Sequence, residues 1–352
     1  WVVQGPKVQE FENMVAHVTG TKHAIAVSSC TTGLHLALVG LGIGAGDEVI
    51  VPSFTYVATA NAVEHAGATP IFCDIDLDTF NIDVKQIESK ITRKTKAIIP
   101  VHLFGLSADM NPVMGLAGKY RLKVIEDAAC ALAALYEKRT AGGIGDVGCF
   151  SFHPRKLVTT GEGGMLTTND DSLAEQFRSL RNHGATLSDL ARHNKGGFLL
   201  PEFNILGYNY RMTDLQGAIG IEQMKKLDWM IENRIRLAKR YDEMLKEVKW
   251  LKVPYIPTNT RPTYQSYVVL VAEDFKISRN DIMQKLEDAG ISVRQGTHAV
   301  HTLGYYRQKY RFKESDFPNA LKADKQSMAI PLYPQMSDEE QNYVLEKINH
   351  IL

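Results

Sequence analysis

The spacing of apolar side chains predicts that this chain is built from alternating helices and strands. Apolar residues separated by four and then three positions recur at four places, and this spacing puts them on one face of a helix. The four sets are Leu34, Leu38, Leu41; Leu173, Phe177, Leu180; Ile282, Leu286, Ala289; and Val344, Ile348, Ile351. The last set follows Ser337-x-x-Glu340, a capping box that predicts where its helix begins.

Short runs rich in β-branched residues lie between these helices and indicate strands. The runs are EVIVP (48–52), TPIFCDI (69–75), KAIIPVHLF (96–104), LKVIED (122–127), VGCFSF (147–152) and MLTTN (165–169). Continuous apolar strands that alternate with helices are typical of a parallel sheet covered on both faces. The pattern up to about residue 210 therefore predicts a mostly parallel sheet between helices.

The second half of the chain has a different pattern. A charged, helix-forming stretch runs from Met212 to about Val248, and the Pro-rich segment VPYIPTNTRP (253–262) follows it. The strands YVVLVAE and ISVRQ then alternate with helices. We therefore predict an α/β fold with a large domain over residues 1–235 and a smaller C-terminal α+β domain over residues 236–352.

Composition narrows the class of protein. The chain has 352 residues, of which 44% are hydrophobic and 23% charged, as in ordinary globular proteins. Its 40 basic and 40 acidic residues cancel, which argues against nucleic acid or an anionic membrane as a partner. No run reaches the roughly 18 apolar residues of a membrane span, and WVVQGPKVQE, which begins without Met, shows no signal-peptide pattern.

The cysteines add a prediction about the cell compartment. Cys30, Cys73, Cys130 and Cys149 are far apart and form no CxxC pair. This spacing argues against a metal site or a disulfide framework, and free thiols fit a reducing environment. We expect a soluble, cytoplasmic protein without a bound metal.

One glycine motif is misleading. GLGIGA (40–45) matches the dinucleotide pattern G-x-G-x-x-A, which must follow a strand and open a helix. Here a predicted helix precedes the motif and the strand 48–52 follows it. We interpret it as a helix-ending turn.

Lys156 lies in SFHPRKLVTTGEGG (151–164), a connection rich in Gly, Ser and Thr between two predicted strands. A lysine is by default a solvated surface charge. At the edge of such a sheet it can instead form a Schiff base, provided that its pKa is low enough to expose the neutral amine.

Two further segments suggest what that lysine would bind. Asp127 ends the run 122–127, where open parallel sheets bind ligands, although Asp is also a common helix N-cap. VSSCTTGLHLAL (27–38) enters a helix whose free N–H groups favour phosphate, although an ordinary capped helix start explains it too. A lysine, an acid that keeps a pyridine nitrogen protonated, and a phosphate cradle are what pyridoxal phosphate (PLP) requires.

Ordered motifs along essentially the whole chain resemble the DegT/DnrJ/EryC1/StrS family of sugar aminotransferases, which have the aspartate-aminotransferase-like fold (fold type I). These motifs are QGPKVQEFE, VSSCTTGLHLAL, GDEVIVPSFTYVATANA, TPIFCDID, VIEDAA, SFHPRK with GEGG, RNHG, GYNYRM and AIPLYP. So many matches in the same order are specific, whereas any one of them alone would be weak.

The resemblance implies a role for particular residues of this chain. It makes Lys156 the lysine that forms the Schiff base with PLP and moves the proton, and it places Asp127 at the pyridine nitrogen. The other implied cofactor contacts are Ser151 and the amides of Cys30 and Thr31 at the phosphate, Tyr56 over the ring, and Asn209 reaching the phosphate bound by a second subunit. Matches near the amino donor or the sugar are His183, Arg211 and His301, for each of which a structural role is an equal alternative.

Two positions depart from the family's pattern. Cys130 stands where the family usually has a Gln or His that bonds the phenolic oxygen of PLP, and a thiol is a poor substitute. SSCT replaces the commoner S-G-T, which removes some flexibility from the turn but keeps its backbone donors.

The resemblance implies a homodimer with shared active sites. It also implies that the protein moves an amino group from an amino acid, glutamate, to a nucleotide-linked keto-sugar. The accepting carbon is expected to be C4 of an NDP-4-keto-6-deoxyhexose. An aminotransferase acting on a cyclic ketone without a nucleotide, such as an inosose, is the first alternative. A PLP-binding regulator without turnover is the second. A third is the family's dehydratase branch, which has His in place of the lysine; the presence of Lys156 argues against it.

Overall fold

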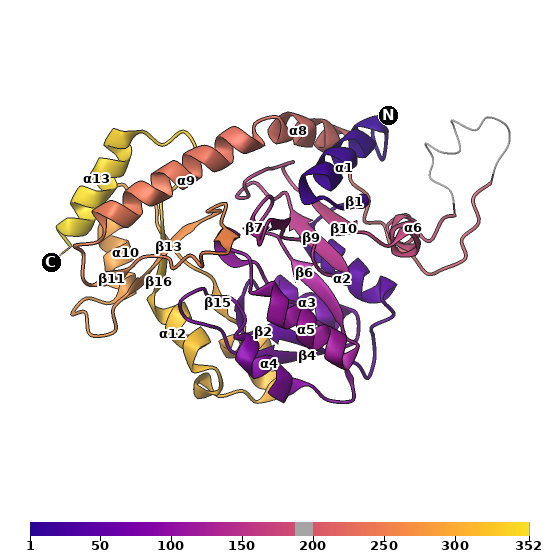
Figure 1. Cartoon of the computed structure of the whole chain (residues 1–352), viewed down its shortest axis with the longest axis horizontal. Helices are drawn as coiled ribbons and strands as arrows, with labels where there is room; N and C mark the ends of the chain where they lie inside the picture. The colour runs from indigo at the N-terminus through magenta and orange to yellow at the C-terminus, as the bar shows by residue number, and fades with distance from the viewer. Residues whose placement is uncertain (187–199, 352) are drawn as a thin grey trace.

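A computed structural model describes residues 1–186 and 200–351 and is organised around a seven-stranded sheet with helices on both sides (Figure 1). In spatial order the strands are β1 (His23–Val27), β10 (Gly164–Thr168), β9 (Val147–Ser151), β6 (Lys123–Asp127), β5 (Thr95–Ile98), β2 (Glu48–Pro52) and β4 (Thr69–Cys73). From β9 to β4 neighbouring strands are parallel, whereas β10 runs antiparallel to both β9 and β1. The mostly parallel sheet is as predicted.

The register of the strands brings several chain segments to one edge of this sheet. Ser151 at the end of β9 pairs with Gly164 at the start of β10, and Gly164 pairs with Val27 at the end of β1. On the other side of β9, Asp127 at the end of β6 pairs with Cys149. The carboxyl ends of β1, β6 and β9 therefore lie side by side.

Alternating side chains of the strands bury both faces of the sheet. The face that includes Val49 and Ile125 packs against α2 (Cys30–Gly40), α3 (Ala58–His65) and α6 (Asp171–Leu180). The face that includes Ile50 and Val124 packs against α4 (Val84–Lys90) and α5 (Met110–Tyr120). The GLGIGA segment lies in the turn between α2 and β2, as interpreted, and Gly42 has a left-handed φ of 71° there.

The helical stretch predicted over 212–248 is two helices, α8 (Asp214–Met224) and α9 (Leu227–Met244). α8 packs along α1 (Pro6–Thr19), and α9 leads toward a second sheet (Figure 1). The second sheet is antiparallel, in the order β11 (Leu251–Lys252), β13 (Tyr267–Val271), β16 (Ser327–Ile330) and β14 (Arg294–Gln295). It shares a core with α9, α10 (Arg279–Asp288) and α13 (Asp338–Asn349). The predicted capping box is present at α13, where Ser337 accepts a hydrogen bond from the Glu340 amide.

One C-terminal segment packs back onto the first sheet. β15 (His298–Ala299) pairs with β3 (Phe54–Thr55), and α11 (Gly304–Tyr310) and α12 (Pro318–Gln326) follow it. Tyr306 and Phe317 pack against Phe72, and the Asp74 carboxylate accepts hydrogen bonds from two amides at the start of α12. Residues on both sides of position 235 therefore pack into one core, and the division into two domains at that position stays a prediction.

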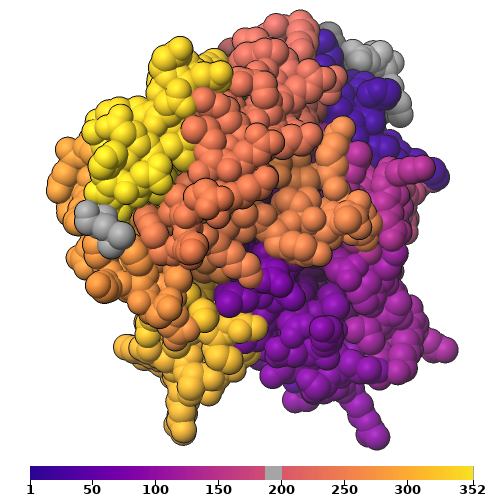
Figure 2. Space-filling model, turned by 60° about the vertical axis from the view of Figure 1, so that its left-hand side comes forward, coloured from indigo at the N-terminus to yellow at the C-terminus, as the bar shows by residue number. Residues whose placement is uncertain are grey.

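The segment that leads into β13 is also in contact with the first half of the chain. Figure 2 shows it in orange, next to violet residues. The Thr263 amide donates to the Gly105 carbonyl, and a small third sheet joins β12 (Thr260–Arg261) to β7 (Leu135–Tyr136) and β8 (Arg139–Thr140). Among the described residues, no helix is long and apolar enough to cross a membrane, and no cluster of side chains could ligate a metal.

Candidate active site

Lys156 lies in a turn of the connection between β9 and β10, where its amide donates to the His153 carbonyl. Its side chain is half-buried, and its Nζ is 3.0 Å from the Cys130 Sγ. The Gln265 side chain holds the same turn from the segment that leads into β13, because its Nε2 donates to the Arg155 carbonyl at 2.5 Å. The turn that carries the lysine is thus in contact with two distant parts of the chain, at Cys130 and at Gln265.

The charge state of Lys156 follows from these neighbours. Burial lowers the pKa of Lys156. The charge of Cys130 and the hydrogen bond to it are the main causes that act in the opposite direction, and the net pKa lies above its ordinary value. Schiff-base chemistry requires a pKa low enough to expose the neutral amine. In the structure Cys130 opposes that requirement.

Asp127 is a buried carboxyl at the end of β6, only 5% exposed. It accepts hydrogen bonds from Thr59 Oγ1 at 2.8 Å and from the Ala129 amide at 3.2 Å. No helix begins after it, so the N-cap alternative is wrong and a turn follows instead. Burial raises its pKa, and the bonds from Thr59 and Ala129 offset this only in part.

Glu126, the adjacent residue, has a structural role. It accepts hydrogen bonds from the His102 Nε2 and from the amides of Gly142, Ile144 and Gly145, at 2.6–2.8 Å. The Ala108 amide donates to His102 Nδ1, which fixes the tautomer so that Nε2 carries the proton. The carboxylate therefore holds the connection between β8 and β9 in place.

The start of α2 supplies free backbone donors beside these residues. Ser29 caps the helix by accepting from the Thr32 amide, while the amides of Cys30 and Thr31 donate no hydrogen bond within the described part of the chain. Gly164 lies directly against this turn, since a Cβ at that position would come within 2.6 Å of the Cys30 nitrogen. Ser151 pairs with Gly164, so its hydroxyl lies beside the same helix start.

This donor set fits pyridoxal phosphate. Free amides at a helix start attract a phosphate, a buried acid can pair with a pyridine nitrogen, and a primary amine can bond an aldehyde. Cys30, Asp127 and Lys156 are close enough for the charges of the last two to act on the Cys30 thiol. All three groups therefore lie at one edge of the first sheet.

The remaining predicted residues are spread around this edge. Tyr56 is 62% exposed, at the start of the turn into α3. Asn209 is exposed, whereas its neighbours Tyr208 and Tyr210 stack on one another and pack onto the core. The structure leaves the roles assigned to Tyr56 and Asn209 as predictions.

The three residues matched to the substrate site have different surroundings. Arg211 donates to Asn182 Oδ1 at 2.7 Å, and His183 is exposed with a left-handed φ of 60°. His301 is fully buried, with Nδ1 bonded to Ser53 Oγ and Nε2 bonded to the Glu314 carbonyl oxygen. Both ring nitrogens of His301 are thus engaged within the chain.

Two residues that hold the site were not singled out from the sequence. Thr59 lies one helical turn after Thr55, and both belong to the quoted motif around Tyr56, so their hydroxyls could have been suspected. Gln265 carries no such signal, because its contact with Arg155 spans 110 positions.

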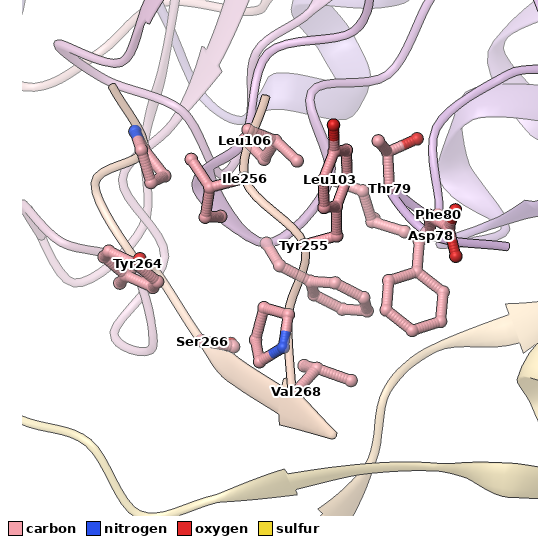
Figure 3. Close-up of a pocket in the computed structure, with 13 residues that line it drawn as sticks. Asp78, Thr79, Phe80, Leu103, Leu106, Tyr255, Ile256, Tyr264, Ser266 and Val268 are labelled. Carbon is pink, nitrogen blue, oxygen red and sulfur yellow. The ribbon is translucent and has the colours of Figure 1, made fainter. Parts of the chain in front are cut away.

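A cavity of about 30 Å³ lies between the connections that follow β4 and β5 and the segment that leads into β13 (Figure 3). Apolar rings and side chains line most of it, including Phe80, Leu103, Tyr255 and Val268. This volume admits about one water molecule, and none of the predicted site residues lines it. The cavity is therefore separate from the lysine.

Comparison with known proteins identifies relatives that cover the whole chain. The sequence profile of the DegT/DnrJ/EryC1/StrS aminotransferase family matches residues 1–349. The spore coat polysaccharide biosynthesis protein SpsC of Bacillus subtilis is 41% identical, over 100% of this chain and 91% of its own. GDP-perosamine synthase of Caulobacter vibrioides is 38% identical, over 99% of this chain and 91% of its own. The PMP form of Spr1654 from Streptococcus pneumoniae, described as a sugar aminotransferase, superposes with a TM-score of 0.92 at 30% identity. The match covers 100% of this chain and 93% of that one.

Proposed function

Because the chain belongs to the DegT/DnrJ/EryC1/StrS aminotransferase family, and is thus a PLP-dependent sugar aminotransferase, we propose that it aminates a nucleotide-linked keto-sugar with L-glutamate as donor. The acceptor carbon is C4 of an NDP-4-keto-6-deoxyhexose. The observation that carries the proposal is the convergence of Lys156, Asp127 and the free amides of α2 at one sheet edge. The relative named GDP-perosamine synthase supports a nucleotide-linked product.

The residues at this edge divide the binding of the cofactor among them. The amides of Cys30 and Thr31 and the Ser151 hydroxyl would hold the phosphate, since they are donors beside a helix start. Asp127 would pair with the pyridine nitrogen from its buried position, oriented by Thr59. When bound, PLP supplies an electron sink for a carbanion next to the transferred nitrogen.

Lys156 would then move protons at the reacting carbons. In the first half-reaction its Nζ, as neutral amine, takes the proton from the α-carbon of glutamate. In the second half-reaction it would act as the acid and donate a proton to C4 of the sugar, the ketone carbon that carried no hydrogen. The turn held by His153 and Gln265 keeps this Nζ at the site.

We propose further that two chains share their active sites in a homodimer. Asn209 is exposed beside two inward-packed tyrosines, so its amide is available to a second chain. Large apolar side chains are exposed on the neighbouring N-terminal segment, α8, α9 and the stretch before Asn209: Val2, Leu215, Ile219, Trp229, Phe203 and Leu206. Exposed apolar surface of this extent is typical of protein–protein contacts.

The test uses purified protein, PLP and ¹⁵N-labelled L-glutamate with a panel of acceptors. The panel contains NDP-4-keto-6-deoxyhexoses, NDP-3-keto-sugars and an inosose, and products are read by mass spectrometry. We expect ¹⁵N in the product of a 4-keto-6-deoxyhexose only. Label in the inosose product, or at C3, would refute the proposed acceptor, and label in no product would refute turnover.

A further inference from the structure

Cys130 and Cys30 lie close enough to Lys156 for their charges to act on its amine, Cys149 lies close to Cys30, and the three thiols differ in environment. Cys30 at the start of α2 and Cys149 on β9 are buried, whereas Cys130 is half-exposed in the turn after β6. Cys130 Sγ also lies 3.0 Å from Lys156 Nζ, so a thiol and an amine are in direct contact. This pair is present although no step of the proposed reaction uses the sulfur.

The two buried thiols are poorly suited to oxidation. Burial raises the pKa of Cys30 and of Cys149 well above normal, and the charge of Asp127 raises both further. Because the thiolate is the form that reacts with oxidants, these two sulfurs are protected. Cys130 is only half-buried, and its Sγ contacts the Lys156 amine, so of the three thiols it is the one that a small oxidant can reach beside the lysine.

We propose that Cys130 and Lys156 form an oxidative modification site, at which peroxide joins the Cys130 sulfur to the Lys156 nitrogen by a covalent S–N bond. In the first step the thiolate attacks one peroxide oxygen, the O–O bond breaks, and hydroxide leaves as water to give a sulfenic acid. In the second step Nζ attacks this sulfur, the S–O bond breaks, and a second water leaves. The thiol and the amine each lose one hydrogen, and peroxide is reduced to two waters.

The first step prepares the amine for the second. In the reduced protein the Cys130 charge and hydrogen bond are the main causes that raise the pKa of Lys156. Conversion of the thiolate to a neutral sulfenic acid removes the charge, so the pKa of the lysine falls from its raised value. The neutral amine therefore becomes available next to the electrophilic sulfur.

The bond has a consequence for cofactor loading, which rests on the proposed role of Lys156. A lysine joined to Cys130 cannot attach PLP, and a lysine that already carries PLP cannot attack Cys130. Oxidation would thus block the cofactor-free protein and spare the loaded one. Thiols reverse such bonds by attack on sulfur, so the block is reversible.

The test treats cofactor-free protein with hydrogen peroxide and follows intact mass and peptide maps. We expect a loss of two hydrogens, a linked pair of peptides containing Cys130 and Lys156, and full reversal by dithiothreitol. Cys130→Ser and Lys156→Arg should both lose the linked pair, whereas the matched control Cys149→Ala should keep it. A gain of one oxygen at Cys130 with a free Lys156 peptide would overturn the proposal.

A disulfide between Cys130 and Cys30 has the same mass change, and Lys156→Arg separates the two. If the loss of two hydrogens persists in Lys156→Arg, the S–N bond is refuted. Visible absorbance after addition of PLP provides the second readout. If protein with the Cys130–Lys156 link still attaches PLP, the S–N bond is supported but Lys156 is refuted as the residue that attaches PLP.

Discussion

Glu126 and Asp127 are adjacent at the end of β6, yet their carboxyl groups have opposite properties. Burial raises the pKa of Glu126. His102 and the amides of Gly142 and Gly145 together lower it by more than burial raises it, so the net pKa lies below its ordinary value. Burial raises the pKa of Asp127, and Thr59 and Ala129 offset this only in part. Because successive strand residues point to opposite faces, Glu126 is satisfied within the fold while Asp127 remains available to a ligand.

Glu126→Gln should destabilise the fold by about 2–4 kcal/mol, because a neutral amide cannot satisfy the same donors. Urea unfolding measures this, and Glu175→Gln on the exposed face of α6 is the matched control. The folded pKa of Glu126 is lowered, so its stabilising effect is present above the ordinary value of 4.5 and is lost as pH falls through the folded value. The free energies of unfolding of the wild type and of Glu126→Gln should therefore become equal in acid. An equal difference in acid and at neutral pH would contradict this role.

Asp127→Asn should have the opposite effect on stability. The folded pKa of Asp127 is raised, so the cost of its buried charge develops as pH rises above the ordinary value of 3.8. At neutral pH the cofactor-free variant should be more stable by about 1 kcal/mol, since Thr59 Oγ1 can accept from the new amide. Its affinity for PLP should fall roughly tenfold or more. Undiminished affinity for PLP would show that Asp127 does not contact the cofactor.

Cys130→Gln should be tolerated and should change the charge state of Lys156. The variant loses the main group that raises the pKa of this lysine, so attachment of PLP, followed by visible absorbance, should reach its midpoint at lower pH. Cys149→Ala, which removes a thiol that does not contact Lys156 Nζ, is the control. An unchanged midpoint in Cys130→Gln would mean that the thiol does not set the pKa of Lys156.

Mixed dimers test whether two chains share a site. Lys156→Ala and Asn209→Ala should each be severely impaired alone, but a mixed dimer has one site with both defects and one with neither. Random mixing makes half of the dimers mixed, so co-refolding should restore roughly a quarter of wild-type activity under two-fold symmetry. No recovery after mass spectrometry has confirmed mixed dimers would place Asn209 within its own chain's site.

Local patterns predicted most of the first sheet and the helices that cover it. EVIVP matches β2 over 48–52 residue for residue, and the +4/+3 spacing located α2, α6, α10 and α13. KAIIPVHLF was predicted as a strand over 96–104, but β5 ends at Ile98. Pro100 has no amide to donate to the ladder, and Phe104 has a left-handed φ of 57°.

Other features depend on contacts that sequence periodicity does not carry. β1 (His23–Val27) was not predicted, because its small residues give a weak strand signal. ISVRQ forms only the two-residue strand β14, and the break between α8 and α9 falls within a continuous helix-forming stretch. The pairing of Lys156 with Cys130 joins segments 26 positions apart, so only the fold reveals it.

The most direct test of the account concerns Lys156 itself. Protein loaded with PLP is reduced with borohydride, which fixes the cofactor to its lysine, and is then digested and mapped by mass spectrometry. We predict that the modified peptide contains Lys156 and that Lys156→Arg yields no modified peptide. Cofactor fixed to another lysine, or fixed equally in the Lys156→Arg variant, would contradict the account.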